Sequence, residues 1–217
     1  MISRFQDRRE AGRLLAARLE EYRGCRDCLL LGLPRGGVVV AAEIARALGL
    51  PMDVCLVRKL GAPFQPELAM GAVAFGGVLV LHQDLIDGWG IPAAAVDRAI
   101  ASEREELQRR ESLYRAGRPP LDLYGKTVIL VDDGIATGAT VEAAISAMRQ
   151  MRAGRVVVAA AVASAATARR LARVADEVVC VLLPEELCAI GEWYEDFDQV
   201  TDGEVLSLLE APLHERM

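Results

Sequence analysis

The chain has 217 residues, of which 53% are hydrophobic and 26% are charged, and its formal net charge is −6. A composition this apolar supports a sizeable core, which excludes intrinsic disorder and suits one large domain or one domain with a small appendage. The longest largely apolar stretch, residues 156–168, is too short and alanine-rich to span a bilayer, and residues 1–9 are too charged for a signal peptide. We therefore expect a cytoplasmic protein.

Apolar runs of strand length alternate with helical patterns along the chain. Strands are expected at residues 28–33, 53–57, 78–81, 126–131, 156–162 and 178–182. Helices are expected at residues 5–22, 38–48, 92–115, 141–151 and 165–173. A loop is expected at residues 61–71, which contain two prolines. Buried-type strands that alternate with helices are typical of a parallel sheet covered on both faces, so the sequence predicts an α/β fold on an open parallel sheet.

Acidic residues gather near the C-terminus, where residues 174–215 contain twelve Asp and Glu but no Lys or Arg. The remainder of the chain is therefore basic, which suits an anionic ligand, although a solvated acidic surface explains the same distribution. The acidic part also carries Trp193 and Tyr194. We predict a core domain at residues 1–183 and a small C-terminal lobe at residues 184–217 that covers the ends of the strands.

Five cysteines are present, and Cys25 and Cys28 form a C-x-x-C motif without a second pair at the spacing of a zinc site. Cys28, Cys55 and Cys180 lie in apolar, strand-like runs. We expect reduced, buried thiols, with a metal or redox role as the alternative.

The fourth expected strand and the turn that follows it carry the most specific pattern, V-I-L-V-D-D-G-I-A-T-G-A-T over residues 128–140. A buried strand delivers Asp132 and Asp133 to its exposed end, and a turn rich in glycine and threonine then opens a helix. Free N–H groups at a helix start cradle a phosphate, and the carboxylates suit a neighbouring group rich in hydroxyls or a magnesium ion. A sugar phosphate therefore fits this pattern, and an Asp pair that only caps the helix is the alternative.

These thirteen residues resemble the phosphoribosyl pyrophosphate (PRPP) motif of type I phosphoribosyltransferases, in which four apolar residues and two acids precede a Thr-Gly-x-Thr turn. The resemblance implies that Asp132 and Asp133 bind the 2′ and 3′ hydroxyls of the ribose. It also implies that the turn binds the 5′-phosphate through Ala136, Thr137, Gly138, Ala139 and Thr140. Several purine-salvage members have an Asp, assigned to proton transfer with the base, at the position of Ala136, whereas other members have Ala.

A second strand end, L-P-R-G-G at residues 33–37, also turns into a helix. Arg35 offers a cationic fork for phosphate oxygens, and Gly36 and Gly37 let backbone N–H groups approach closely, although an ordinary turn has the same pattern. Its place in the chain resembles that of the family's pyrophosphate loop. Lys59 follows the next expected strand, and Arg58-Lys59 resembles the family's basic residues at this position, with a surface lysine as the alternative.

Three further expectations follow from the same resemblance. Residues 61–71 correspond in position to the flexible catalytic loop that closes over PRPP, and Glu67 lies within them. The C-terminal lobe resembles the hood that holds the acceptor base, so Trp193 or Tyr194 is expected to stack on a flat ring, with anchoring of the lobe as the alternative. His82 has no visible partner in the sequence and is expected at the surface.

The layout of residues 29–183 and the segments P-R-G-G, R-K-L-G, P-E-L-A-M-G-A and G-E-W-Y-E-D-F resemble bacterial phosphoribosyltransferases whose acceptor is not assigned. The resemblance implies an enzyme that binds Mg–PRPP, transfers the phosphoribosyl group to a nitrogen of a base-like acceptor and releases pyrophosphate. Asp132, Asp133, Lys59 and Arg35 are the candidate catalytic residues. Mg²⁺ is expected to bind mainly through PRPP, with no metal ligands assigned to the protein.

The expected partners are small molecules, namely PRPP and the acceptor, and neither nucleic acid nor a membrane is expected. The sequence leaves a homodimer open. The main alternative function is a non-catalytic regulatory protein that senses PRPP or nucleotides. Hydrolysis of an activated ester or phosphate is a weaker alternative, because no nucleophile elbow is recognisable.

Overall fold

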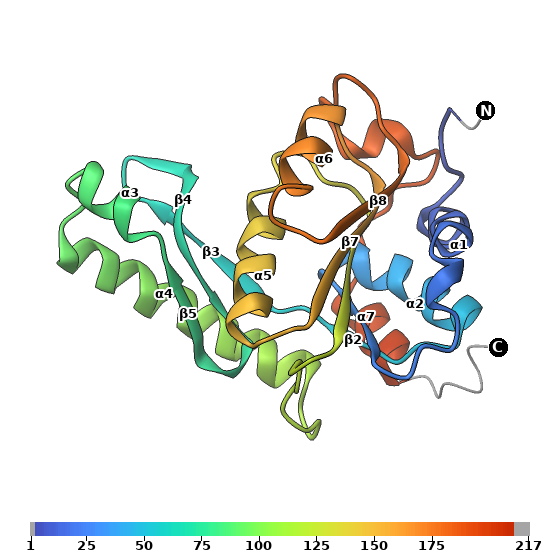
Figure 1. Ribbon diagram of the computed structural model, residues 1–217, viewed down its shortest axis with the longest axis horizontal. Helices are drawn as coiled ribbons and strands as arrows, with labels where there is room; N and C mark the ends of the chain where they lie inside the picture. Colours follow the sequence, from blue (N-terminus) through green and yellow to red (C-terminus); the bar gives the residue numbers. More distant parts are fainter. Residues whose placement is uncertain (1–2, 211–217) are drawn as a thin grey trace.

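The computed structural model describes residues 3–210, and its centre is a five-stranded parallel sheet in the order β2-β1-β6-β7-β8 (Figure 1). The strands are β1 (Cys28–Gly32), β2 (Met52–Val54), β6 (Thr127–Asp132), β7 (Arg155–Val162) and β8 (Glu177–Leu182). Every β7 residue except the first is buried, as expected for a central strand covered on both faces.

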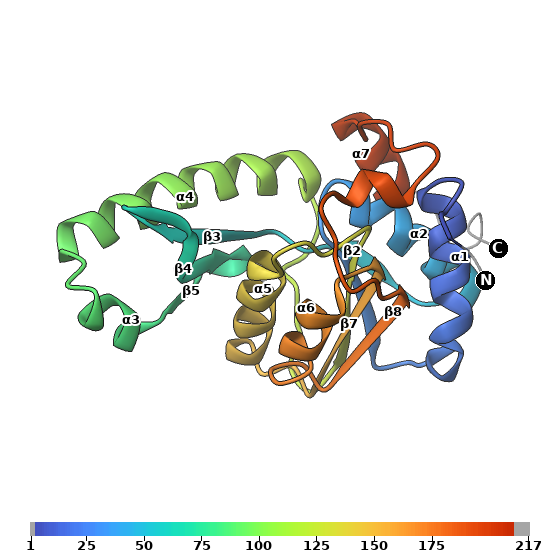
Figure 2. The ribbon, with the colours of Figure 1, turned by 90° about the horizontal axis from the view of Figure 1, so that it is seen from above.

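Helices cover both faces of this sheet (Figure 2). The helices α1 (Arg8–Arg18) and α2 (Gly36–Leu48) pack on one face, and α5 (Ala139–Gln150) and α6 (Ala165–Leu171) lie on the other. The predicted α/β fold with an open parallel sheet is therefore confirmed. The first helix starts later than predicted, because the Asp7 side chain caps it by accepting the N–H of Glu10 at 2.7 Å.

Residues 57–114 form an arm that projects from the parallel sheet (Figures 1 and 2). The arm contains an antiparallel sheet of β3 (Val57–Ala62), β4 (Gln65–Ala74) and β5 (Val78–Leu81), followed by α3 (Gln83–Gly88) and α4 (Ala93–Tyr114). The predicted loop at residues 61–71 is wrong, because most of these residues belong to the β3–β4 hairpin. Their Gly, Ala and Pro content gives little strand signal, and the tertiary pairing overrides it.

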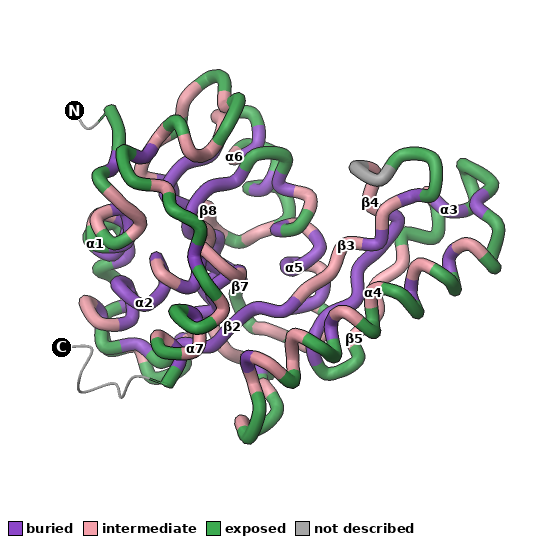
Figure 3. Tube along the Cα trace, turned by 180° about the vertical axis from the view of Figure 1, so that it is seen from behind, coloured by how far each residue is buried: buried purple, intermediate pink, exposed green. Residues whose placement is uncertain are grey.

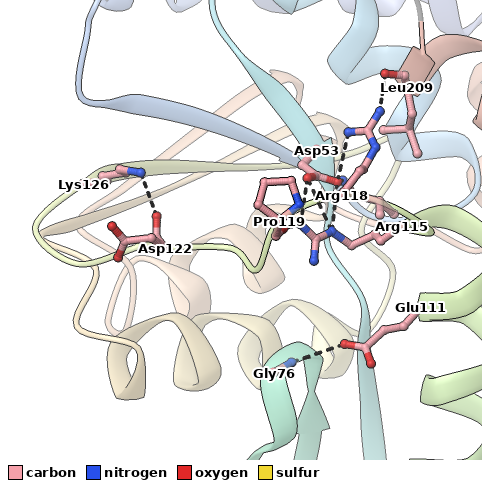
Figure 4. A network of polar contacts seen from close by, with 10 residues as sticks. Asp53, Gly76, Glu111, Arg115, Arg118, Pro119, Asp122, Lys126 and Leu209 are labelled. Atoms are coloured by element: carbon pink, nitrogen blue, oxygen red, sulfur yellow. Dashed lines mark hydrogen bonds and ion pairs between the residues drawn. The ribbon is translucent and has the colours of Figure 1, made fainter.

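The base of the arm is tied to β2 by a buried ionic cluster (Figure 4). The Asp53 carboxylate is 3.2 Å from the guanidinium of Arg115 and 3.6 Å from that of Arg118. Within the arm itself, the Glu111 carboxylate of α4 accepts the N–H of Gly76 at 3.2 Å. A buried carboxylate is stable only with such partners, so the cluster holds the C-terminal end of α4 against the parallel sheet. Farther out, α4 leaves most of its surface exposed (Figure 3).

The C-terminal segment returns across α1 and α2 and contains a short helical turn η3 (Ile190–Trp193) and the helix α7 (Asp202–Glu210). The N–H of Phe5 donates to the carbonyl of Trp193 at 2.9 Å, so the segment before α1 lies beside η3. The boundary at residue 184 stays a prediction, and residues 211–217 of the predicted lobe lie outside the described residues.

Two cysteine expectations have different outcomes. Cys25 and Cys28 form a disulfide, which corrects the expectation of a reduced Cys28, because the turn before β1 brings their Cα atoms to 5.3 Å. Cys55 and Cys180 are free and buried, as expected, and burial raises the pKa of the Cys180 thiol to about 11. None of the helices within residues 3–210 has the length and apolar character needed to cross a membrane.

Candidate functional site

The strand order reverses between β1 and β6, because the chain leaves β1 toward β2 on one side and leaves β6 toward β7 on the other. Gly32 pairs with Val131, so the carboxyl ends of the two strands lie next to each other. Ligands of open α/β sheets bind in the crevice that such a reversal opens. The loops after β1 and β6 are therefore where the fold itself places a site.

Two glycines allow these loops to approach each other. A Cβ atom on Gly37 would lie 2.5 Å from the carbonyl oxygen of Val131 and 3.0 Å from the Cα of Asp132. A Cβ atom on Gly36 would collide with the carboxylate of Asp133. The glycines of the P-R-G-G segment are therefore needed for packing against the two acids, in addition to any contact with a ligand.

A hollow of about 720 Å³ opens between the two loops and the arm. The β1 loop contributes Leu33 and Pro34, and the motif after β6 contributes Asp132 and Thr140. The arm contributes a wall from β3, the hairpin turn and α4, namely Val57, Arg58, Lys59, Gly61, Ala62, Pro63, Ala99, Glu103 and Arg110, and Cys55 completes the lining. The two segments singled out in the sequence therefore border one space, which the arm closes from a third side.

The adjacent acids face different ways. Asp132 lines the hollow, and its Oδ1 accepts the N–H of Asp133 at 2.9 Å. The Asp133 carboxylate instead meets the guanidinium of Arg8, with Nε and Oδ2 at 2.6 Å. Burial, and next the charge of Asp133, raise the pKa of Asp132 well above its ordinary value. A ligand that donates hydroxyl hydrogen bonds or carries positive charge would be favoured at such a carboxylate.

Two side chains of α6 hold the turn between β6 and α5 by hydrogen bonds. Gly138 precedes α5 with a φ of 73° and provides no side-chain cap to the helix. The hydroxyl of Thr167 donates to the carbonyl of Ala136 at 2.9 Å, and the guanidinium of Arg170 donates to the carbonyl of Thr137. Two carbonyls of the turn are thus hydrogen-bonded to α6, and the first N–H groups of α5 have no side-chain cap. A turn of this kind is suited to bind an anion.

The basic residues predicted for the site occupy different places. Lys59 lines the hollow, but it lies inside β3 and not after a strand, because the chain enters this strand at Val57. Arg35 follows a cis peptide bond and precedes α2, with its guanidinium 3.9 Å from the Asp202 carboxylate of α7. Arg58, the other basic residue of the R-K-L-G segment, lines the same hollow and pairs with Glu103 of α4 at 2.6 Å.

Tyr194 supports the loop after β6 from the interior. The residue is 4% exposed, its hydroxyl donates to the backbone carbonyl of Asp133 at 2.6 Å, and its ring lies 5.2 Å from that of Phe5. Burial, and next the charge of Asp133, raise the pKa of Tyr194. Stacking of Trp193 or Tyr194 on an acceptor stays a prediction, and this burial argues against Tyr194.

Two other expected residues, His82 and Glu67, belong to the arm. His82 is exposed, as expected, and borders a second hollow of about 290 Å³ together with Thr137 and Arg170. The side chain of Glu67 lies outside the described residues. Neither α4 nor α1 carries a motif, so the sequence offered no signal for the contributions of Glu103 and Arg8 to this region.

A family model described as the phosphoribosyl transferase domain matches residues 3–189, which is most of the chain. The chain belongs to the phosphoribosyl transferase family. The match contains both loops and the whole arm, and it ends before Trp193 and Tyr194.

Individual relatives of this chain agree with the family match. A Mycobacterium tuberculosis H37Rv protein, named provisionally as a phosphoribosyl transferase, is 47% identical over 206 residues, which cover 95% of this chain and 46% of that protein. The chain therefore spans about half the length of this curated relative. The crystal structure of TT1426 from Thermus thermophilus superposes with a TM-score of 0.87 at 48% identity and covers 95% of this chain and 97% of that chain.

A more distant relative is the bifunctional protein PyrR of Chloroflexus aurantiacus, which is 34% identical over 121 residues. The aligned part covers 54% of this chain and 59% of that protein. The family match places a phosphoribosyl transferase domain around the loops after β1 and β6. The residues that line the hollow determine which ligand and which acceptor fit there.

Proposed function

We propose that this phosphoribosyl transferase binds Mg–PRPP in the hollow between the two loops and the arm. It transfers the phosphoribosyl group to a nitrogen of a base-like acceptor and releases pyrophosphate. The observation that carries the proposal is the single space of about 720 Å³ bordered by Asp132, Thr140 and Lys59. These residues supply a carboxylate for hydroxyl groups, a helix start for a phosphate and a cation for a pyrophosphate. The volume lies within the range of small-molecule sites.

The sugar end of PRPP belongs at the motif after β6. The 5′-phosphate is bound by the turn from Ala136 to Thr140, because the first N–H groups of α5 have no side-chain cap there. The ribose hydroxyls then donate to the carboxylate of Asp132, which lines the same hollow. The backbone N–H of Asp133 donates to this carboxylate and so helps to hold it in place.

The pyrophosphate end belongs between the P-R-G-G segment and Lys59. Pro34 of this segment lines the hollow, and Lys59 faces it from β3. Arg35 is half-exposed, and its contact with Asp202 is long, at 3.9 Å, so little free energy holds its guanidinium away from a ligand. These groups would stabilise the charge that develops on the departing pyrophosphate.

The proposed reaction needs no protein nucleophile. The bond between the anomeric carbon and the pyrophosphate oxygen breaks, and the electron pair leaves with pyrophosphate while positive charge builds on the ribose ring. The acceptor nitrogen donates its lone pair to the same carbon, and a proton on that nitrogen is lost to solvent or to a nearby base. The site contributes by holding both substrates in place and by excluding water beneath the arm.

The donor set of the site suits a magnesium ion that arrives with PRPP. Within residues 3–210, no group of three or more His, Cys, Asp or Glu side chains is arranged to hold a metal ion. In this proposal the oxygens of PRPP are the main ligands of the ion. When bound there, Mg²⁺ neutralises part of the charge on the leaving pyrophosphate.

The acceptor is proposed to lie against the arm. Ala62, Pro63 and Ala99 give this side of the hollow a largely apolar wall suited to a flat ring, and the Arg58–Glu103 pair beside it offers hydrogen-bond donors and acceptors. In this arrangement the residues predicted from the sequence to stack on the ring, Trp193 and Tyr194, anchor the C-terminal segment instead.

Calorimetric titration with Mg–PRPP tests the binding site. The wild-type chain should bind, and the double variant Asp132→Asn/Asp133→Asn should lose at least about tenfold in affinity, because charge-assisted hydrogen bonds are lost. Asp97→Asn, on the exposed side of α4, is the matched control and should bind like the wild type. Absence of binding to the wild type, or unchanged affinity in the double variant, would reject the assignment.

Turnover is tested separately, by measuring pyrophosphate release with a panel of purine and pyrimidine bases. Release that depends on one base supports the transferase and identifies its acceptor. Tight binding of Mg–PRPP without release for any base would favour the regulatory alternative, in which the pocket senses PRPP.

A further inference from the structure

Arg8, the first residue of α1, contacts the second acid of the motif, and two of its three side-chain nitrogen atoms donate hydrogen bonds. Its Nε lies 2.6 Å from Oδ2 of Asp133, and the two side chains are only 12% and 13% exposed. Its Nη1 donates to the backbone carbonyl of Asp198 at 2.8 Å. The guanidinium also lies 3.8 Å from the centre of the Phe197 ring, within the range of a cation–π contact.

The same side chain reaches the loop after β1. A Cβ atom on Gly36 would lie 2.8 Å from Nε of Arg8 and would collide with the carboxylate of Asp133. Arg8 therefore fills the space between the P-R-G-G segment, the second acid of the motif and the C-terminal segment.

Charge explains why an arginine is needed at this position. Two adjacent carboxylates at the end of a buried strand repel each other, and a buried carboxylate without a partner is costly. Arg8 compensates Asp133 and draws its carboxylate away from the hollow, so Asp132 alone of the pair lines that space. A guanidinium can do this while it also bonds Asp198 and contacts Phe197, whereas an ammonium group provides only a point charge.

We propose that Arg8 is a positioning residue for the sugar end of the site. It holds Asp133 away from the hollow, which sets the place of Asp132 at the ribose hydroxyls, and it links this acid pair to the C-terminal segment. The inference rests on the proposed function, since it assigns Asp132 to the ribose. It predicts that a residue outside the motif controls affinity for the sugar phosphate but not for pyrophosphate.

A comparison of ligands tests this role. Arg8→Gln, Arg8→Lys and the wild type are titrated with Mg–PRPP, with ribose 5-phosphate and with magnesium pyrophosphate. The matched control is Arg9→Gln, because the Arg9 side chain is adjacent but 53% exposed and pairs with Glu43. Arg8→Gln should weaken both sugar ligands by about tenfold or more and change pyrophosphate affinity by less than about twofold. Arg8→Lys should recover part of the loss, and Arg9→Gln should resemble the wild type.

A double-variant cycle separates positioning from a general structural role. In the Asp133→Asn background, Arg8→Gln should change ribose 5-phosphate affinity by less than about twofold, because the group it positions no longer carries charge. If Arg8→Gln does not fold, Arg8→Lys in both backgrounds gives the same comparison.

Equal weakening of sugar ligands and pyrophosphate, unchanged sugar affinity, or an undiminished effect in the Asp133→Asn background would overturn the assignment of Arg8. These results leave the proposed function intact, provided that the wild type binds Mg–PRPP. A wild-type chain that binds neither sugar ligand refutes the proposed function, and the role of Arg8 then falls with it.

Discussion

The substitution Asp132→Asn should increase the stability of the protein while removing its ligand affinity. The carboxylate of Asp132 lines the hollow, and its Oδ1 accepts the N–H of Asp133 at 2.9 Å. Asn keeps an oxygen at this position and removes the charge. Because burial and the neighbouring carboxylate raise the pKa of Asp132, its ionised form is disfavoured in the folded protein, and that cost disappears in the variant.

The sign of the pH dependence follows from linkage. A carboxyl whose pKa is higher in the folded state binds its proton more tightly there, so the free energy of unfolding falls as the pH rises from the unfolded pKa, near 3.8, through the folded one. Each unit of pKa difference corresponds to about 1.4 kcal/mol. For a domain of this size, each kcal/mol shifts the melting temperature by roughly 2–4 °C.

Thermal unfolding followed by circular dichroism between about pH 4 and pH 8 measures this effect. The variant should melt above the wild type at the upper end of the range, and the difference should shrink toward the lower end. Its affinity for Mg–PRPP should fall by at least about tenfold in calorimetry. A difference in melting temperature that does not change with pH would refute the argument from burial, and wild-type affinity would refute the role at the hollow.

Two further substitutions test the loops that surround the hollow. Gly37→Ala places a Cβ atom 2.5 Å from the carbonyl of Val131, so it should destabilise the protein by about 1–3 kcal/mol in denaturant titration and weaken pyrophosphate binding. Gly88→Ala, where nothing lies within 4 Å, is its control, and equal stability of the two variants would contradict the predicted crowding. Thr167→Val removes the 2.9 Å hydrogen bond to the carbonyl of Ala136, and ribose 5-phosphate affinity measured by calorimetry should fall several-fold, about 1 kcal/mol. Unchanged affinity would show that α6 does not hold the turn.

The parallel sheet and its two loops were predictable because their signals are local. The apolar run ending at Val131, followed by acids and a turn, already specifies a strand, an exposed tip and a helix start. Gly49 likewise ends the helix that the pattern from residue 38 predicted, with its φ of 66°. The fold class and the place of the motif at a strand end therefore follow from the order of residues alone.

The arm was not predictable in the same way. The hairpin at residues 57–74 is rich in Gly, Ala and Pro, so its strands exist because they pair with each other and pack against α4 and α5. The wall that the arm gives to the hollow, including Glu103 on a helix of ordinary charged pattern, depends on that packing. Long-range pairing of this kind leaves no periodic trace in the residues that take part.

The sequence by itself determined a strand that ends in two acids and a phosphate-type turn, because neighbouring residues build all of these features. Only the tertiary structure decided how the two acids divide. Arg8 and Asp133 are 125 positions apart in the chain, and they meet because α1 packs over the sheet beside the end of β6. An ion pair between segments so distant depends on the fold as a whole, so the sequence does not show which of the two acids pairs with Arg8 and which lines the hollow.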